Sequence, residues 1–239
     1  MSRFLVIFGK DLKVSRTEGI FLLILLWSPI AAAMARWVIH LIGADFATMG
    51  PFLLPIWLTF NLIFIGVMLL AGLFIHEKEN NTWPALRLTP ITLWELISAK
   101  MVVGLLLSVV SAALLILLNV GFDNIFPLLV ITLFGSLFTL LFGLLVSHFG
   151  KAMMQFMITT RLLMLPLMLP AIIYLIPGVE ADWLKFIPTY FILRATEQVA
   201  VHGASLGDIA VDMGILTAVS IALLFVNLKI IARRERRSF

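Results

Sequence analysis

The polar residues best suited to specific contacts gather in one insert, residues 76–100, which lies between two long apolar segments. Thr82 can cap a helix with Pro84 in its first turn, and that helix must end before Pro90, because a residue preceding proline avoids the α region. A short helix with exposed apolar and charged side chains is typical of a docking surface for another protein. The expected docking residues are Glu77, Glu79, Thr82, Trp83, Leu86 and Arg87.

A second helix start follows the short helix directly. Thr92 and Glu95 have the Thr-x-x-Glu spacing of a capping box, which predicts a helix that begins at Leu93 and continues through Lys100 into the next apolar segment. The short helix would then be held rigidly between two long ones. The alternative is a solvated polar loop, which requires neither cap.

Several kinds of chemistry are excluded by residue type. The chain has no Cys, so it forms no disulfide and has no thiolate metal site or cysteine nucleophile. Its four His residues stand singly at segment ends, which argues against a metal site. There is no G-x-x-x-x-G-K-[ST] phosphate loop and no intramembrane Asp, Glu or His relay. If the protein moves a solute uphill, another chain must supply the energy.

The elements that position this insert are membrane helices. The chain is 62% hydrophobic with a mean hydropathy of +1.12, well beyond a soluble domain. Segments long enough, or nearly so, to cross about 30 Å of hydrocarbon must be helical, because lipid cannot satisfy backbone polar groups. The fold class is therefore an all-α integral membrane protein with six transmembrane helices. The predicted spans are residues 20–42, 51–75, 101–120, 127–147, a fifth that ends at 176, and 209–231.

Basic residues indicate the orientation. If the N-terminus is cytoplasmic, only Arg36, Lys185 and Arg194 of the 17 Lys and Arg residues lie outside. The positive-inside rule therefore places both termini in the cytoplasm. The alternative is a cleaved signal peptide at the start, but its charged region would be unusually long and would contain Asp11 and Glu18.

Residues 1–19 are expected to form an interfacial helix. Phe4, Leu5, Phe8 and Leu12 share one helical face, while basic residues including Lys10 and Lys13 lie largely on the other. A helix of this kind can anchor the chain at anionic lipid or dock a partner, and the sequence leaves both open.

The fifth span contains a basic residue that is expected below the membrane surface. A helix ending at residue 176 is too short if it starts after Arg161, so it must begin near Met153, which puts Arg161 below the membrane surface. An ionisable residue at that depth is a functional candidate. The simpler alternative is that its side chain snorkels to the inner headgroups.

Residues 177–208, before the last span, are too apolar for a free loop and too interrupted to cross. They predict two short re-entrant helices in the outer leaflet that meet near Pro188, with Arg194 and Glu197 spaced to pair. The segment can be an outer gate or only a lipid anchor. The expected gate residues are Trp183, Pro188, Tyr190, Arg194 and Glu197.

Together these features resemble the membrane subunit of an ABC type-2 exporter over essentially the whole chain, as a single transmembrane domain. The residues that support the resemblance are the interfacial helix, Glu77-Lys78-Glu79-Asn80-Asn81-Thr82, Leu88-Thr89-Pro90, Trp94-Glu95, Ala99-Lys100 and Ile187-Pro188-Thr189-Tyr190. The family usually has Gly where Asn81 stands. Within the family, the chain looks most similar to permeases of bacterial fluoroquinolone-type drug exporters.

The resemblance implies a permease that binds no cofactor and is not itself an enzyme. Two cytoplasmic ATPase subunits would bind ATP and Mg, and a second permease, identical or a sister chain, would complete the transporter in a bacterial or archaeal cytoplasmic membrane. The cargo would be hydrophobic or amphipathic, drug-like or lipid-like, and no nucleic acid is implied. The alternatives are a haem- or sodium-exporting permease of the same architecture and a membrane assembly protein without transport activity.

Overall fold

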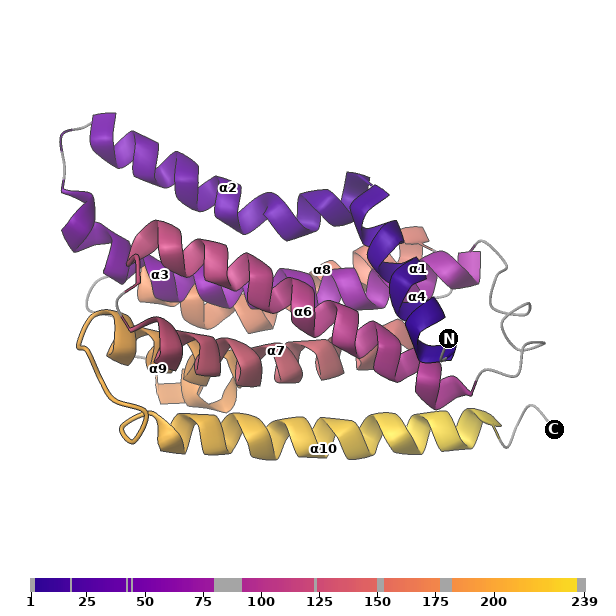
Figure 1. Cartoon of the computed structure of the whole chain (residues 1–239). Coiled ribbons are helices and arrows are strands. Elements are labelled where there is room, and N and C mark those ends of the chain that lie inside the picture. Colours follow the sequence, from indigo (N-terminus) through magenta and orange to yellow (C-terminus); the bar gives the residue numbers. More distant parts are fainter. Residues whose placement is uncertain are drawn as a thin grey trace.

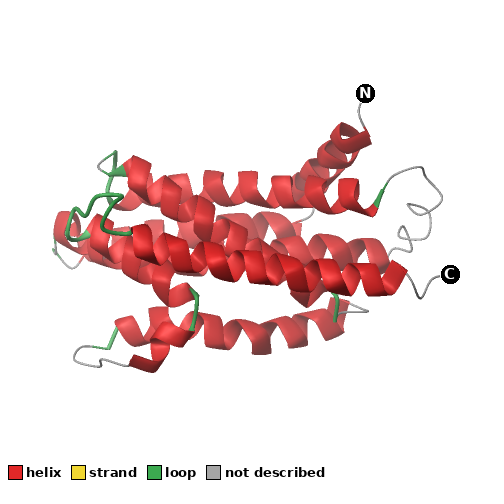
Figure 2. Ribbon diagram, turned by 90° about the horizontal axis from the view of Figure 1, so that it is seen from below, coloured by secondary structure: helices red, strands yellow, loops and turns green. Residues whose placement is uncertain are grey.

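A computed structural model describes residues 3–17, 19–41, 43, 45–79, 92–122, 124–149, 153–176 and 182–235. Long helices lie side by side along one axis, and both termini lie at the same end of the bundle (Figure 1). Six helical segments are long and apolar enough to cross a membrane, which confirms the predicted number. All of the regular structure in the described residues is helical, as the view from below also shows (Figure 2).

The helices follow in chain order. They are α1 (Arg3–Thr17), α2 (Gly19–Leu41), α3 (Phe46–Ile63), the π-helix η1 (Phe64–Leu69), α4 (Leu70–Glu79), α6 (Leu93–Asn119), α7 (Ile125–Ser147), α8 (Met153–Tyr174), the 3₁₀-helix η2 (Asp182–Phe186), α9 (Thr189–Ala200) and α10 (Ala210–Glu235). The starts predicted at Leu93 and near Met153 are confirmed.

The second span, formed by α3, η1 and α4, is the central element. Of its most apolar stretch, 83% is buried inside the molecule, against 22% for α10. The π-helical turn was not predicted, because a wider turn leaves no mark in an apolar sequence. At η1, Gly66 packs directly on α7, where an added Cβ would overlap Thr139, and a Cβ on Gly143 would overlap the Gly66 carbonyl. Small residues therefore allow these two helices to approach closely.

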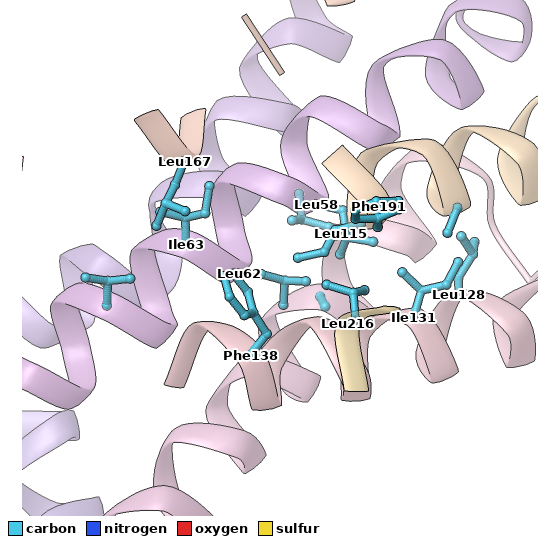
Figure 3. Close-up of a cluster of buried hydrophobic side chains, with 14 of the residues drawn as sticks. Leu58, Leu62, Ile63, Leu115, Leu128, Ile131, Phe138, Leu167, Phe191 and Leu216 are labelled. Carbon is cyan, nitrogen blue, oxygen red and sulfur yellow. The ribbon is translucent and has the colours of Figure 1, made fainter. Parts of the chain in front are cut away.

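The main core lies between this central span and its neighbours. Figure 3 shows buried side chains from several helices meeting there, including Leu62 of α3, Phe138 of α7 and Leu216 of α10. Phe191 of α9 reaches the same core, so the short outer helix is packed against the bundle.

A polar contact fixes α2 to the bundle at a proline. Pro29 has no N–H to donate to the carbonyl of Leu25, one turn earlier. The Ser111 hydroxyl of α6 donates to that carbonyl at 2.9 Å and lies 2.8 Å from the Asn61 side-chain amide of α3. Three helices are thus joined in the apolar interior at a backbone group that the proline leaves free.

Candidate functional site

Four charged side chains meet at the end of the bundle where both termini lie, and we call them the inner charge cluster: Lys10, Asp11, Glu77 and Lys100. Lys100 Nζ lies 3.1 Å from Asp11 Oδ2 and 3.2 Å from Glu77 Oε1. Lys10 Nζ lies 2.6 Å from the same Glu77 oxygen. The two acids and two bases balance, and the cluster joins α1, α4 and α6.

Burial makes the inner charge cluster unusual. Lys100 is 0% exposed, and its ammonium also lies 5.2 Å from the centre of the Phe74 ring. Asp11 and Glu77 are 1% and 3% exposed. Charges removed from water need close partners, since an unpaired buried ion costs several kcal/mol. This arrangement therefore requires α1, α4 and α6 to stay together.

Burial also changes the protonation of Asp11. It raises the pKa of the Asp11 carboxyl above its ordinary value of 3.8. The Lys100 ammonium opposes this rise in pKa, whereas the neighbouring Glu77 carboxylate adds to it.

The face of α1 that packs on the bundle was not predicted from the sequence. It contains the buried residues Ile7, Asp11 and Ser15, whereas Leu5, on the predicted apolar face, is 51% exposed on the protein surface. Phe8 and Leu12 lie half-buried at the edge of the packed face, against the cluster around Val103 and Leu107. The helix is turned toward the position where Asp11 meets Lys100, and the side chain of Phe4 lies outside the described residues.

The inner charge cluster brackets the predicted docking insert. Glu77 is near the end of α4, and Lys100 lies in the second turn of α6, which starts at the predicted capping box. Thr92 N donates to Glu95 Oε2 at 2.8 Å, and Glu95 N donates to Thr92 Oγ1 at 3.2 Å. Both flanks of residues 80–91 are therefore fixed, and α1 is ion-paired to each flank.

Most of the predicted docking residues fall outside this description. Thr82, Trp83, Leu86 and Arg87 lie outside the described residues, as does the side chain of Glu79. Glu77 was expected on the docking surface, but its carboxylate points inward to two lysines. The correction has a physical cause, because packing of α1 on α6 brings both lysines to Glu77, and a carboxylate buried in this way must be paired.

At the opposite end, η2 and α9 form the predicted pair of short helices around Pro188. Thr189 Oγ1 donates to the Leu167 carbonyl at 2.6 Å, which ties α9 to α8. Between α8, η2 and α9 lies a cavity of about 390 Å³, which we call the outer cavity. Its apolar lining is Pro170, Ile173, Leu184 and Leu193, and its polar lining is Tyr174, Asp182, Lys185, Tyr190, Arg194 and Glu197.

Three of the five predicted gate residues line the outer cavity, namely Tyr190, Arg194 and Glu197. They occupy one face of α9, at steps of four and three residues. Trp183 is 49% exposed and lies outside the lining, as does Pro188, which precedes α9.

The expected ion pair between Arg194 and Glu197 is wrong. Arg194 Nη1 lies 3.5 Å from Asp212 Oδ1 of α10, whose side chain is 3% exposed. Glu197 instead lies beside the phenol of Tyr174 in α8. The packing of α9 decides which residues Arg194 and Glu197 meet, because it brings Arg194 to α10 and Glu197 to α8. Neither Asp212 nor Tyr174 was singled out from the sequence, since both lie in long apolar segments.

Arg161 has an exposed side chain on α8. It lies along an apolar groove of about 610 Å³ between α2 and α8, with η1 as the floor. Arg161 lies about 12 Å along α8 from Met153, at ~1.5 Å per residue.

A family model described as "ABC-2 family transporter protein" matches residues 44–229. The match extends from the start of α3 into α10, whereas α1 and α2 precede it. No curated protein matches the chain significantly, and no solved structure does so either.

Proposed function

The chain belongs to the ABC-2 transporter family, and on that premise we propose that it is the permease subunit of an ATP-driven exporter. The observation that supports this most directly is the ion pairing of α1 to both ends of the 76–100 insert. Such an arrangement is suited to receiving force at the insert and passing it to the spans. ATP and Mg would be bound by a separate ATPase subunit, in two copies, and a second permease would complete the pathway.

The docking surface for the ATPase would be the short helix with Trp83, Leu86 and Arg87, capped at Thr82 and flanked by Glu79. Glu77 would act indirectly, by holding α1 and α6 in place beside that surface. When the ATPase dimer closes, the flanks of the insert would move as one unit with α1. The two permeases would then rock relative to each other.

The cargo would be hydrophobic or amphipathic, of drug-like or lipid-like character, and would leave past η2 and α9 acting as an outer gate. The outer cavity supports this, because both apolar and charged side chains line it. Arg194 and Glu197 are held by different neighbours, so movement of α9 would separate both contacts together.

Docking is tested by Leu86→Asp in the full chain, co-expressed with its ATPase. A charge in an apolar contact should reduce co-purification of the ATPase and uncouple ATP hydrolysis from export, without loss of membrane insertion. The matched control is Ser98→Asp, which adds the same charge at an exposed position of α6. Normal export and normal co-purification of Leu86→Asp would contradict the docking proposal.

The proposed orientation, with both termini in the cytoplasm, has its own test. A reporter active only outside the membrane should be silent when fused after Arg87 or Arg237. It should be active after Asp123 or His202. An active fusion after Arg87 would overturn the topology, whatever the ATPase experiment shows.

A further inference from the structure

A layer of polar side chains crosses the apolar interior where α2, α3 and α6 pack together. We call it the mid-bundle polar layer, and it consists of Ser28 of α2, Asn61 of α3, and Ser108 and Ser111 of α6. None of the four is more than 1% exposed. On each helix the layer lies between residues of the same two apolar clusters, as Ser28 does between Ile24 and Ala32. The four residues therefore share one level of the bundle.

The mid-bundle polar layer has more polar groups than partners for them. The Oγ of Ser111 lies 2.9 Å from the Leu25 carbonyl and 2.8 Å from Asn61 Oδ1, but a hydroxyl has one hydrogen and can donate to only one of them. Asn61 Nδ2 and the hydroxyls of Ser28 and Ser108 have no hydrogen-bond partner among the described residues. Turning the Asn61 amide exchanges its oxygen and nitrogen but still leaves one of them unpaired.

Several buried hydroxyls elsewhere in the bundle are satisfied within their own helix. Thr132, Thr196 and Ser220 each donate to the carbonyl four residues earlier, at 2.7 to 2.8 Å. Ser28 and Ser108 do not make this bond. A buried polar group without a partner is costly, so three such groups at one level indicate a ligand that supplies the missing hydrogen bonds.

The backbone is irregular beside the mid-bundle polar layer. In α2, Pro29 leaves the Leu25 carbonyl without its helical donor, and in the second span η1 begins at Phe64, three residues after Asn61. Turns of π-helix are frequent at functional sites. Within a membrane, irregular backbone is tolerated where it is buried in protein or faces water. A free carbonyl and unpaired side chains thus lie together on two irregular helices.

A ligand for these groups must be small and must both accept and donate hydrogen bonds. The serine hydroxyls and the Asn61 amide need an acceptor, which a cation does not provide, while the Leu25 carbonyl and the Asn61 oxygen share a single hydrogen. Side chains this deeply buried are out of reach of lipid and of other chains. Water meets all these needs, because a buried water makes about three hydrogen bonds.

We propose that the mid-bundle polar layer binds an internal water molecule that joins α2 to α3 and α6. A bridging water stabilises a contact nearly as well as a direct hydrogen bond does. Because water can exchange its partners, this contact would let α2 shift against its neighbours without leaving their polar groups unpaired.

Serine-to-alanine variants of the purified full chain distinguish a hydrated layer from a dry one. If water is bound, Ser28→Ala and Ser108→Ala each remove a hydrogen bond and should lower the folding equilibrium constant about fivefold, or ~1 kcal/mol, in chemical unfolding. If the layer is dry, each change removes an unpaired hydroxyl, and unchanged or raised stability would overturn the proposal. The matched control Ser220→Ala removes a buried hydroxyl that bonds within its own helix and should have little effect.

A shared water also couples the two serines. The double variant should lose less stability than the sum of the single losses, because the second change acts where the water is already lost. Additive losses would mean that no water is shared, and would refute the proposal.

Two measurements separate water from other causes of coupling. A density map of the full chain that resolves ordered water should show a peak within hydrogen-bond distance of Asn61 and of a serine of the layer. Direct contact between the serine hydroxyls, with no such peak, would overturn the proposal. Replacing Na⁺ by K⁺ at constant ionic strength should leave the unfolding midpoint unchanged, whereas stabilisation by Na⁺ alone would mean a bound cation and would also overturn it. Neither measurement uses transport.

Discussion

The two ends of the bundle differ in how far their charged side chains are buried. In the inner charge cluster, Lys100 contacts two carboxylates at 3.1 and 3.2 Å and is fully buried. At the outer cavity, Arg194 is 44% exposed and 3.5 Å from Asp212. The pair formed by Lys185 and Asp182 is open to solvent.

We call the inner charge cluster a fixed joint, because its ion pairs hold α1, α4 and α6 together. The contacts at the outer cavity, in contrast, can rearrange. Moving α1 away from α6 would leave ions unpaired in a dry site, which costs several kcal/mol. At the outer cavity, breaking the Lys185 and Arg194 ion pairs costs less, because these side chains already contact water, although α9 stays packed on the core through Phe191. We infer that the inner end transmits displacement and that the outer end changes shape.

The largest effect is expected for Lys100→Leu. This change leaves Asp11 without a cation and Glu77 with only Lys10, and should cost about 3–5 kcal/mol of unfolding free energy. Chemical unfolding in detergent measures the loss, with the exposed Lys229→Leu of α10 as control. Adding Asp11→Leu should restore part of the stability, because it removes the buried carboxylate that lost its cation, while Glu77 keeps Lys10. Equal stability of Lys100→Leu and its control would contradict the fixed joint.

An intermediate effect is expected at the outer cavity. Arg194→Leu should cost about 1–2 kcal/mol, between an exposed pair and a fully buried one. In a double-mutant cycle, Arg194→Leu should couple to Asp212→Leu and not to Glu197→Leu. Coupling to Glu197→Leu alone would mean that Arg194 pairs with Glu197, as the sequence predicted. In that case α10 would take no part in the outer gate.

A smaller, pH-dependent effect follows from Asp11. Because its pKa is raised in the folded protein, the folded state takes up a proton at higher pH than the unfolded state. The stabilisation from this proton uptake is complete below pH 3.8 and is lost as the pH rises through the raised pKa of Asp11. Relative to Asp11→Asn, the wild type should therefore gain stability as pH falls. A relative loss in the same series of unfolding curves would show that ion pairing with Lys100 outweighs burial.

The fold could be predicted from short-range patterns in the sequence. Apolar length predicts the spans, and the capping box at Thr92 and Glu95 predicts the start of α6. Residues around Pro188 predict two short helices, because proline interrupts a segment that is too apolar for water. Each of these signals depends on neighbours within a few residues.

The ion-pair partners of the charged residues could not be predicted from such short-range patterns. Asp11 and Lys100 are 89 positions apart, and a lone aspartate in an amphipathic helix has the pattern of an exposed residue. For Arg194, the i,i+3 spacing favours Glu197, yet packing of α9 on α10 brings Asp212 closer. Helix rotation and packing, which sequence periodicity leaves open, decide which charges meet.

The smallest effect is expected for Lys185→Gln, which removes the exposed partner of Asp182 in the outer cavity. Although Lys185 Nζ and Asp182 Oδ1 are 2.6 Å apart, the side chains are 57% and 93% exposed, so water already solvates both. Such pairs contribute little, and salt screens them over about 10 Å at 0.1 M. The unfolding midpoint should therefore match that of the wild type at low and at high salt, whereas the deficit of Lys100→Leu should persist at both. A clear, salt-sensitive loss in Lys185→Gln would mean that η2 is held by this pair, and the outer end would then be a second fixed joint.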